Sequence, residues 1–292
     1  MMRWLLAGPL PVDGVCNLVR EYLGFQGVRV CKVQGCSEWI NAVVHLPQGR
    51  IACARDRSVR IWNVSECEAV LEGHTDLVLC LAFCAASCAQ LASGSSDFTV
   101  RLWGTRSVLK GHTGTVFSLA YLDADRLASG SADHTVRIWD VMHNTCLETL
   151  SGHTGCVKAL IVLPSGLLAS GSRDKTVRVW DHHVSVMRGH QEWVTALTVL
   201  EDGTLVSGGL DRTIRRWRDG SCINIISRIG VVTALAGLPG NLIACGFHDD
   251  FVVFDSIGHI MFRARDVGVH ALSFRKGQLV VGTKLGEMQV WE

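Results

Sequence analysis

The chain has 292 residues, of which 48% are hydrophobic, so it is long enough and apolar enough to bury a large core. Its 28 Lys and Arg balance 27 Asp and Glu, and the formal charge of +1 provides no general attraction for nucleic acid or anionic lipid. This balance disfavours nucleic acid as the main ligand and a membrane surface as the site of action.

The amino-terminal segment, residues 1–26, differs in pattern from the rest. Its apolar stretch at 4–10 is broken by Gly8 and Pro9 and is too short to span a membrane. A helical period follows in Val12, Val15, Cys16, Leu18, Val19, Tyr22 and Leu23, with Asp13 as a possible cap and Gly24 at the end. We expect a short amphipathic helix that packs its apolar face on the side or floor of the remaining chain.

The remainder, residues 27–292, repeats one unit seven times. An aromatic residue closes each unit at intervals of 41, 36, 41, 37, 37 and 37 residues: Trp62, Trp103, Trp139, Trp180, Trp217, Phe254 and Trp291. A regular period near 40 residues is the signature of a repeat architecture.

One unit contains four strand-length segments. In the third unit they lie near 116–121, 127–131, 135–139 and 145–150, with turn residues between them. Four strands cannot cover both faces of their own small sheet, so neighbouring units must stack face to face. The alternating segment at about 28–33 has no unit of its own, and we expect it to pair with the seventh unit, whose last strand would otherwise be an exposed edge.

Specific motifs accompany the period. Gly-His pairs at 73–74, 111–112, 152–153 and 189–190 are each followed by a Leu/Ala-Ser-Gly-like strand, an Asp and a Trp. This pattern resembles the WD-repeat β-propeller family, and the resemblance covers residues 27–292. It is closest over residues 91–103, 127–140, 168–181 and 205–217. The resemblance implies an all-β, seven-bladed β-propeller of four-stranded antiparallel blades, with the ring closed by the amino-terminal strand.

Ser, His and Asp recur together in four units. The sets, each with the closing Trp, are His74, Ser93, Asp97 and Trp103; His112, Ser129, Asp133 and Trp139; His153, Ser170, Asp174 and Trp180; and His190, Ser207, Asp211 and Trp217. A catalytic triad occurs once, in a cleft, whereas these serines lie within strands at a fixed distance from Asp and Trp. We interpret each set as a buried structural relay that satisfies polar groups, and we expect no enzyme activity.

In the family that this chain resembles, partner contacts fall three and five residues after the His and one before the Asp. Carried onto this sequence, these positions form three rows of seven residues, which include Thr115, Cys156, Gly268, Ser96 and Ala132. From these rows the predicted binding face consists of Trp39, Arg55, Leu77, Leu79, Phe117, Lys158, Arg173, Trp193, Leu210, His248, His270 and Lys284. Aromatic and basic residues dominate the set, and such residues are frequent hot spots of interfaces. The set would suit an acidic peptide or protein segment with an apolar or aromatic anchor.

Other sites have little support in the sequence. Cys84 and Cys88 are close together, but no second Cys or His pair follows at zinc-site spacing. The cysteines are irregularly placed and read as reduced thiols, which favours a cytosolic or nuclear protein. No Gly-rich phosphate loop or dinucleotide fingerprint is present, so neither a metal nor a cofactor is expected.

Three classes of function follow, in decreasing order of support. The first is a non-enzymatic interaction scaffold, acting as a monomeric propeller within a larger complex. The second is a substrate receptor or adaptor of a ubiquitin ligase, because Leu10-Pro11 followed by Leu18-Val19 and Tyr22-Leu23 resembles the opening of an F-box. The third is an enzyme with its site in the central channel.

Overall fold

The computed structural model describes residues 28–32, 39–63, 66–85, 90–181, 183–227, 230–265 and 267–291, the first range by its backbone alone. The expected helix within residues 1–26 lies outside the described residues, as do Cys88 and the end of the expected closing strand at residue 33. No helix in the described part of the chain is both long and apolar enough to cross a membrane.

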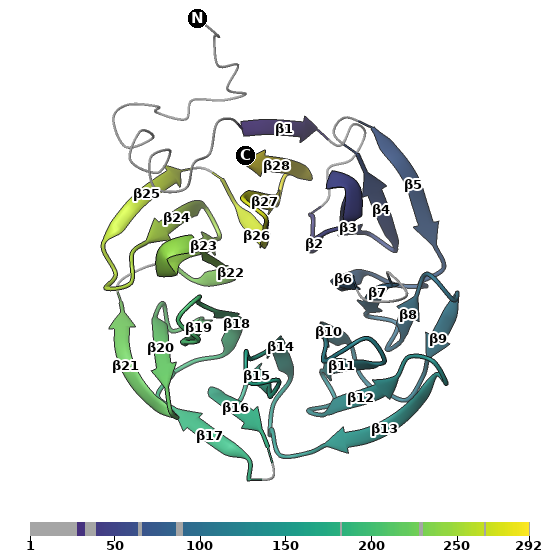
Figure 1. Cartoon of the computed structure of the whole chain (residues 1–292), viewed down its shortest axis with the longest axis horizontal. Coiled ribbons are helices and arrows are strands. Elements are labelled where there is room, and N and C mark those ends of the chain that lie inside the picture. The colour runs from purple at the N-terminus through teal and green to yellow at the C-terminus, as the bar shows by residue number, and fades with distance from the viewer. Residues whose placement is uncertain are drawn as a thin grey trace, which may run out of the picture.

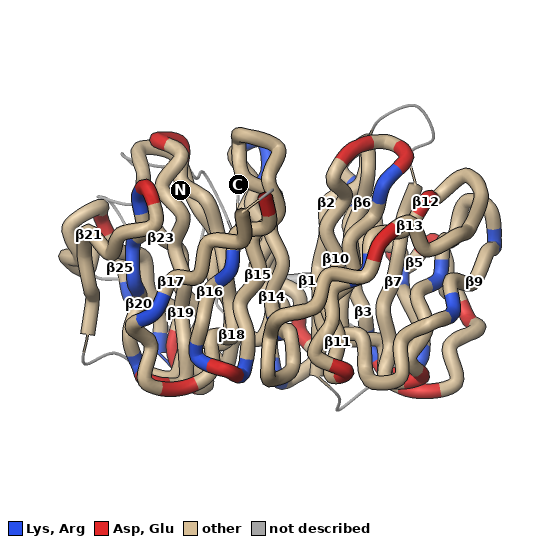
Figure 2. Tube along the Cα trace, turned by 90° about the horizontal axis from the view of Figure 1, so that it is seen from below, with Lys and Arg blue, Asp and Glu red and all other residues tan. Residues whose placement is uncertain are grey.

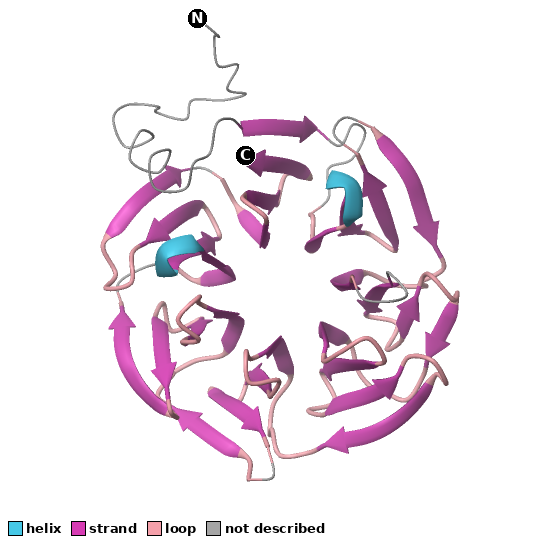
Figure 3. Cartoon of the chain, in the orientation of Figure 1, coloured by secondary structure: helices cyan, strands magenta, loops and turns pink. Residues whose placement is uncertain are grey.

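Seven four-stranded antiparallel sheets are arranged as blades around a central axis (Figure 1), which confirms the predicted all-β propeller. Figure 3 shows strands throughout the ring and two short helical turns, 3-10 helices η1 (Pro47–Gly49) and η2 (Pro239–Asn241). In each blade the first strand is innermost and the fourth is outermost, as the order of pairing requires.

The strand bounds follow the repeat. Blade 1 contains β2 (Ala42–His45), β3 (Ile51–Arg55), β4 (Ser58–Trp62) and β5 (Cys67–Glu72); blade 2 contains β6 (Val78–Cys84), β7 (Gln90–Ser95), β8 (Val100–Leu102) and β9 (Ser107–Leu109). Blade 3 contains β10 (Val116–Tyr121), β11 (Arg126–Ser131), β12 (Val136–Asp140) and β13 (Thr145–Leu150); blade 4 contains β14 (Val157–Val162), β15 (Leu168–Ser172), β16 (Thr176–Trp180) and β17 (Ser185–Arg188). Blade 5 contains β18 (Val194–Val199), β19 (Leu205–Gly209), β20 (Ile214–Arg218) and β21 (Ser221–Ile226); blade 6 contains β22 (Val232–Leu238), β23 (Leu242–Phe247), β24 (Asp250–Phe254) and β25 (Ile260–Arg265). Blade 7 contains β26 (Val269–Arg275), β27 (Gln278–Thr283) and β28 (Glu287–Trp291), joined by β1 (Val28–Lys32).

The two ends of the described chain meet in blade 7. Strand β1 pairs antiparallel with β28, from Val28 opposite Trp291 to Lys32 opposite Glu287. Figure 1 shows β1 as the outermost strand of this blade, beside the C-terminal strand. The sheet order β1-β28-β27-β26 therefore gives blade 7 the same four strands as the others.

Close packing between blades depends on a glycine in the second strand. A Cβ added to Gly130 would lie 2.7 Å from Val157 Cγ1 in the next blade, and one added to Gly171 would lie 2.6 Å from Val194 Cγ1. Both distances are shorter than van der Waals contact, so the glycine is what allows the next inner strand to approach. The valines themselves are fully buried in the contact between the blades.

The ring has two faces, shown from the side in Figure 2. One face is formed by the connections from the fourth strand of each blade to the next blade and by the turns between the second and third strands. We call this face the loop face. The opposite face carries the turns between first and second and between third and fourth strands. Charges of both signs occur on both faces (Figure 2), so neither face forms a field of one sign.

Candidate protein-binding face

Four blades contain the same chain of hydrogen bonds. In blade 3, His112 Nδ1 donates to Asp133 Oδ2 at 2.7 Å, and the Ser129 hydroxyl donates to His112 Nε2 at 2.7 Å. Trp139 Nε1 donates to Ser129 Oγ, also at 2.7 Å. The corresponding distances are 2.8, 2.8 and 2.9 Å for His74, Ser93, Asp97 and Trp103; 2.7, 2.7 and 2.8 Å for His153, Ser170, Asp174 and Trp180; and 2.8, 2.7 and 2.7 Å for His190, Ser207, Asp211 and Trp217.

Electrostatics keep the relay in one protonation state. Burial is the largest influence on the pKa of His112 and lowers it below the usual value, against the raising effect of Asp133. Burial alone would raise the pKa of Asp133, but hydrogen bonds from Thr135 and His112 outweigh this and lower it to about 2. At neutral pH the relay is therefore a neutral imidazole held by a carboxylate. Its serine is fully buried, which leaves the hydroxyl no access to a substrate.

Blades 6 and 7 lack this relay. In blade 7, Val281 stands at the serine position, and Trp291 Nε1 is buried without a hydrogen-bond partner among the described residues. In blade 6, Cys245 replaces the serine, and the closing aromatic is Phe254, which has no N–H to satisfy. These blades are held mainly by apolar contacts, including Phe251 and Phe262 packed around Trp291.

The loop-face positions form adjacent rows in the structure. In five blades the carbonyl of the residue three after the His position accepts a hydrogen bond from the N–H of the residue before the Asp position, at 2.8 or 2.9 Å. The pairs are Leu77 with Ser96, Thr115 with Ala132, Cys156 with Arg173, Trp193 with Leu210, and Gly268 with Lys284. Backbone hydrogen bonds thus join the row three residues after the His position to the row before the Asp position, and they hold these two rows at the same distance in each of the five blades.

Two cations lie over aromatic rings from neighbouring blades. Lys158 Nζ of blade 4 is 3.2 Å from the ring centre of Phe117 in blade 3. The Arg173 guanidinium of blade 4 is 3.6 Å from the ring centre of Trp193 in blade 5. Burial is the main reason that the pKa of Lys158 falls to about 8, and the nearby Arg173 lowers it further. Blades 3, 4 and 5 therefore present one continuous strip of aromatic and basic groups, which we call the 3–5 strip: Phe117, Lys158, Arg173 and Trp193.

A second group forms across blades 6, 7 and 1. Trp39 and His270 stack with ring centres 4.7 Å apart, and His248 approaches His270 edge-on at 6.2 Å. Burial is the first cause that lowers the pKa of His270, followed by the charges of His248 and Lys284. Lys284 Nζ donates to Asp249 at 2.7 Å, so an acidic residue compensates one of the expected basic positions.

The structure corrects the prediction for Arg55. Its side chain is fully buried, like the rest of β3, and Arg55 Nε lies 3.8 Å from the Asp56 carboxylate. Arg55 is therefore unavailable to a partner in this conformation. The other eleven predicted residues retain some exposure, with Trp39 at 53% and Leu77 at 44% the most exposed apolar side chains.

The model of the family described as WD domain, G-beta repeat matches residues 27–63, 65–104, 105–140, 144–181 and 182–218, more than half of the chain. The chain belongs to the WD-repeat family. Blades 6 and 7 fall outside the matched ranges, although the structure gives them the same four-stranded form.

Similarities to individual WD-repeat proteins are partial. Coronin-7 of Homo sapiens is 37% identical over 87 residues, which cover 25% of this chain and 9% of coronin-7. Mitochondrial division protein 1 of Schizosaccharomyces pombe is 28% identical over 166 residues, covering 47% of this chain and 23% of that protein. The chain thus matches only a minor part of the length of either relative.

Solved structures share the whole ring. The structure of U3-55K and the crystal structure of the RRP9 WD40 repeats each superpose with a TM-score of 0.82 at 23% identity and cover 90% of this chain. The chain covers 98% and 96% of those two chains. At this level of identity the likeness shows the WD-repeat fold alone.

Sequence reasoning placed single residues on the loop face of this WD-repeat propeller but missed how they pair. Lys158 on Phe117 and Trp39 on His270 are stacked pairs that join different blades. The sequence also did not reveal Asp249 as the partner of Lys284. Within the described residues, no group of three or more His, Cys, Asp or Glu is arranged to hold a metal ion.

Proposed function

We propose that this chain is a non-enzymatic scaffold that binds a protein or peptide partner on the loop face, as a monomeric propeller within a larger complex of the cytosol or nucleus. The observation that carries this proposal is the 3–5 strip, in which two cations of blade 4 each lie over an aromatic ring of an adjacent blade. Membership of the WD-repeat family supports a scaffold role, because its recurring motif here is structural and leaves the loops free for recognition.

The chemistry of the strip favours an acidic segment with an apolar anchor. Arg173 is exposed and Trp193 is half-buried, so an incoming carboxylate can meet the guanidinium while an apolar side chain covers the indole edge. Stacking on the ring already restricts the Arg173 side chain, which lowers the conformational entropy lost on binding. The group of Trp39, His248 and His270 extends the same face across the ring.

The test is affinity purification of the intact chain with a double substitution, Trp193→Ala and Arg173→Glu. Lys276→Glu, in the turn between β26 and β27 on the opposite face, is a matched control because its side chain is exposed and lies far from the strip in the fold. We expect the double variant to lose partners that the control keeps. Identical partners for both variants, with both chains folded, would refute a role for the strip.

The adaptor alternative rests on residues 1–26, which lie outside the described residues. Direct binding of the intact chain to the linker subunit of a ubiquitin ligase, lost on deletion of residues 1–26, would favour it. Loop-face partners should survive that deletion.

A further inference from the structure

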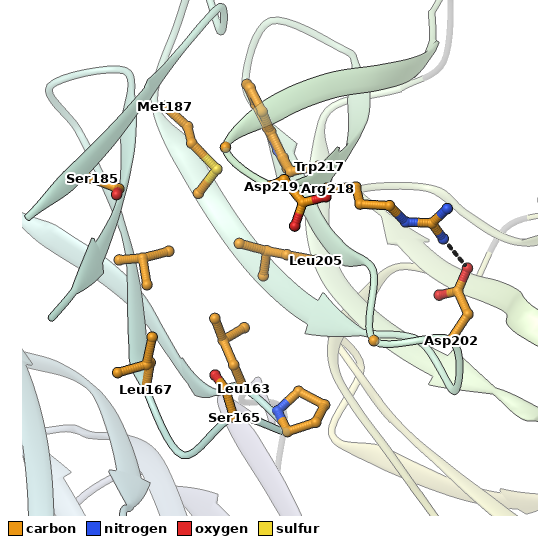
Figure 4. A pocket seen from close by; sticks show the side chains of 14 residues that line it. Leu163, Ser165, Leu167, Ser185, Met187, Asp202, Leu205, Trp217, Arg218 and Asp219 are labelled. Atoms are coloured by element: carbon orange, nitrogen blue, oxygen red, sulfur yellow. Dashed lines mark hydrogen bonds and ion pairs between the residues drawn. The ribbon is translucent and has the colours of Figure 1, made fainter.

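A second, independent site lies on the opposite face, between blades 4 and 5. A pocket of about 550 Å³ opens there, bordered by the β14–β15 turn, the β18–β19 turn and the β20–β21 turn. Figure 4 shows apolar side chains arranged around a common space, with polar groups at its edge. The apolar lining residues are Leu163, Leu167, Val179, Met187, Leu205 and Trp217. Its volume falls within the range of small-ligand and side-chain pockets.

Beside the pocket, the outer strand of blade 4 is shorter than that of blade 3. In blade 3 the outer strand β13 begins at Thr145, which pairs with Asp140, one residue beyond the closing Trp139. In blade 4 the outer strand β17 has four residues and begins at Ser185, which pairs with Val179, one residue before the closing Trp180. Trp180, the last residue of β16, has no partner in β17, and Val179 is partly exposed and lines the pocket.

The walls of the pocket are fixed by local hydrogen bonds. The turn at 163–167 is closed by Leu163 N–H to Leu167 O and by Gly166 N–H to Leu163 O, both at 2.8 Å. The Asp202 carboxylate accepts from Thr204 N–H at 2.9 Å, and Arg218 donates to Asp202 at 2.9 Å and to Thr204 Oγ1 at 3.0 Å. The pocket is thus preformed, which reduces the entropy lost when a ligand enters.

The edge of the pocket holds two carboxylates, of which Asp202 pairs with both Arg216 and Arg218. Arg218 turns away from the space and pairs with Asp202, as the dashed line in Figure 4 shows. Asp219 lies beside the space and has no ion-pair or hydrogen-bond partner in the described part of the chain. It holds a fixed position, because Asp219 and Gly220 have φ of 49° and 75° and form the tight hairpin turn that Asp-Gly favours.

We propose that this pocket, the 4–5 pocket, binds a peptide segment in which apolar side chains are followed by a Lys or Arg. The apolar side chain fills the space against Leu163, Leu167 and Val179, and the cation meets the Asp219 carboxylate. This is the opposite charge preference from the loop face, so the two faces can hold different partners at once. The site does not depend on the proposed function of the 3–5 strip.

The test uses two short acetylated peptides that differ in one residue, two leucines followed by lysine or by glutamate. Binding is followed by the methyl resonance of Met187, which lines the pocket and is assigned with Met187→Leu. We expect the lysine peptide to shift this resonance and to bind roughly three- to tenfold more tightly than the glutamate peptide, as for an exposed charge pair.

Three variants make the result specific. Asp219→Asn keeps a residue that tolerates positive φ and should abolish the preference between the peptides. Leu167→Gln should weaken both peptides equally, and the loop-face variant Trp193→Ala with Arg173→Glu should change neither. An unchanged Met187 resonance at saturating peptide, or a charge preference that survives Asp219→Asn, would overturn the proposal.

Discussion

The relay gives a prediction whose size follows from the contacts of one hydroxyl. Ser129→Ala removes the acceptor of Trp139 Nε1 and the donor to His112 Nε2, two groups that are buried with it. Each buried polar group left unpaired costs about 1 to 3 kcal/mol, so for two such groups we expect the free energy of unfolding to fall by about 2 to 6 kcal/mol. Urea unfolding followed by tryptophan fluorescence measures this loss.

A neighbouring serine provides the matched control. Ser118 lies in the same blade and is also buried, but its hydroxyl has no hydrogen-bond partner among the residues that the structure describes. Ser118→Ala removes an unsatisfied polar group and should leave stability unchanged or raise it slightly. If Ser118→Ala and Ser129→Ala lower the free energy of unfolding by the same amount, the relay does not stabilise the blade through these hydrogen bonds.

Three further predictions follow from the same structure. The relay pKa values of His112 and Asp133 are lower in the folded chain, so stability should be full above about pH 6.5 and fall as pH drops through the histidine and then the carboxylate range. Urea midpoints measured from neutral to acidic pH check this, and a rise on acidification would contradict it. Deleting residues 1–35 removes β1 and leaves β28 as an open edge, so we expect aggregation and a lower unfolding midpoint; a stable monomer in light scattering would refute a closing role for β1. Amide hydrogen exchange should be faster in blades 6, 7 and 1, which lack the full relay, than in blades 2 to 5, and uniform protection would count against this.

The fold was predictable because one period specifies it many times over. The seven closing aromatics alone set the number of blades, and the third unit gave the bounds of β13 to the residue. Blades 6 and 7 could be placed from Phe254 and Trp291 even though their relay His and Ser are replaced, since apolar packing keeps the same spacing as in the hydrogen-bonded blades.

The candidate site was predictable only residue by residue. Lys158 and Phe117 belong to different blades, so their contact depends on how blades 3 and 4 pack together, which no local sequence pattern reveals. The burial of Arg55 could not be predicted from its place in the row either. The equivalent position in blade 4, Arg173, is exposed, so the position alone does not determine exposure.

The repeats also indicate where specificity lies. Ser, Asp and Trp hold the same geometry in blades 2 to 5, so these residues carry no information about a partner. The row before the Asp position, in contrast, holds a different residue in nearly every blade: Arg55, Ser96, Ala132, Arg173, Leu210, His248 and Lys284. Since the backbone bonds that place this row repeat in five blades, its side chains can vary without cost to the fold. A partner that distinguishes one sector of the ring from another must therefore recognise these side chains and the aromatic groups beside them.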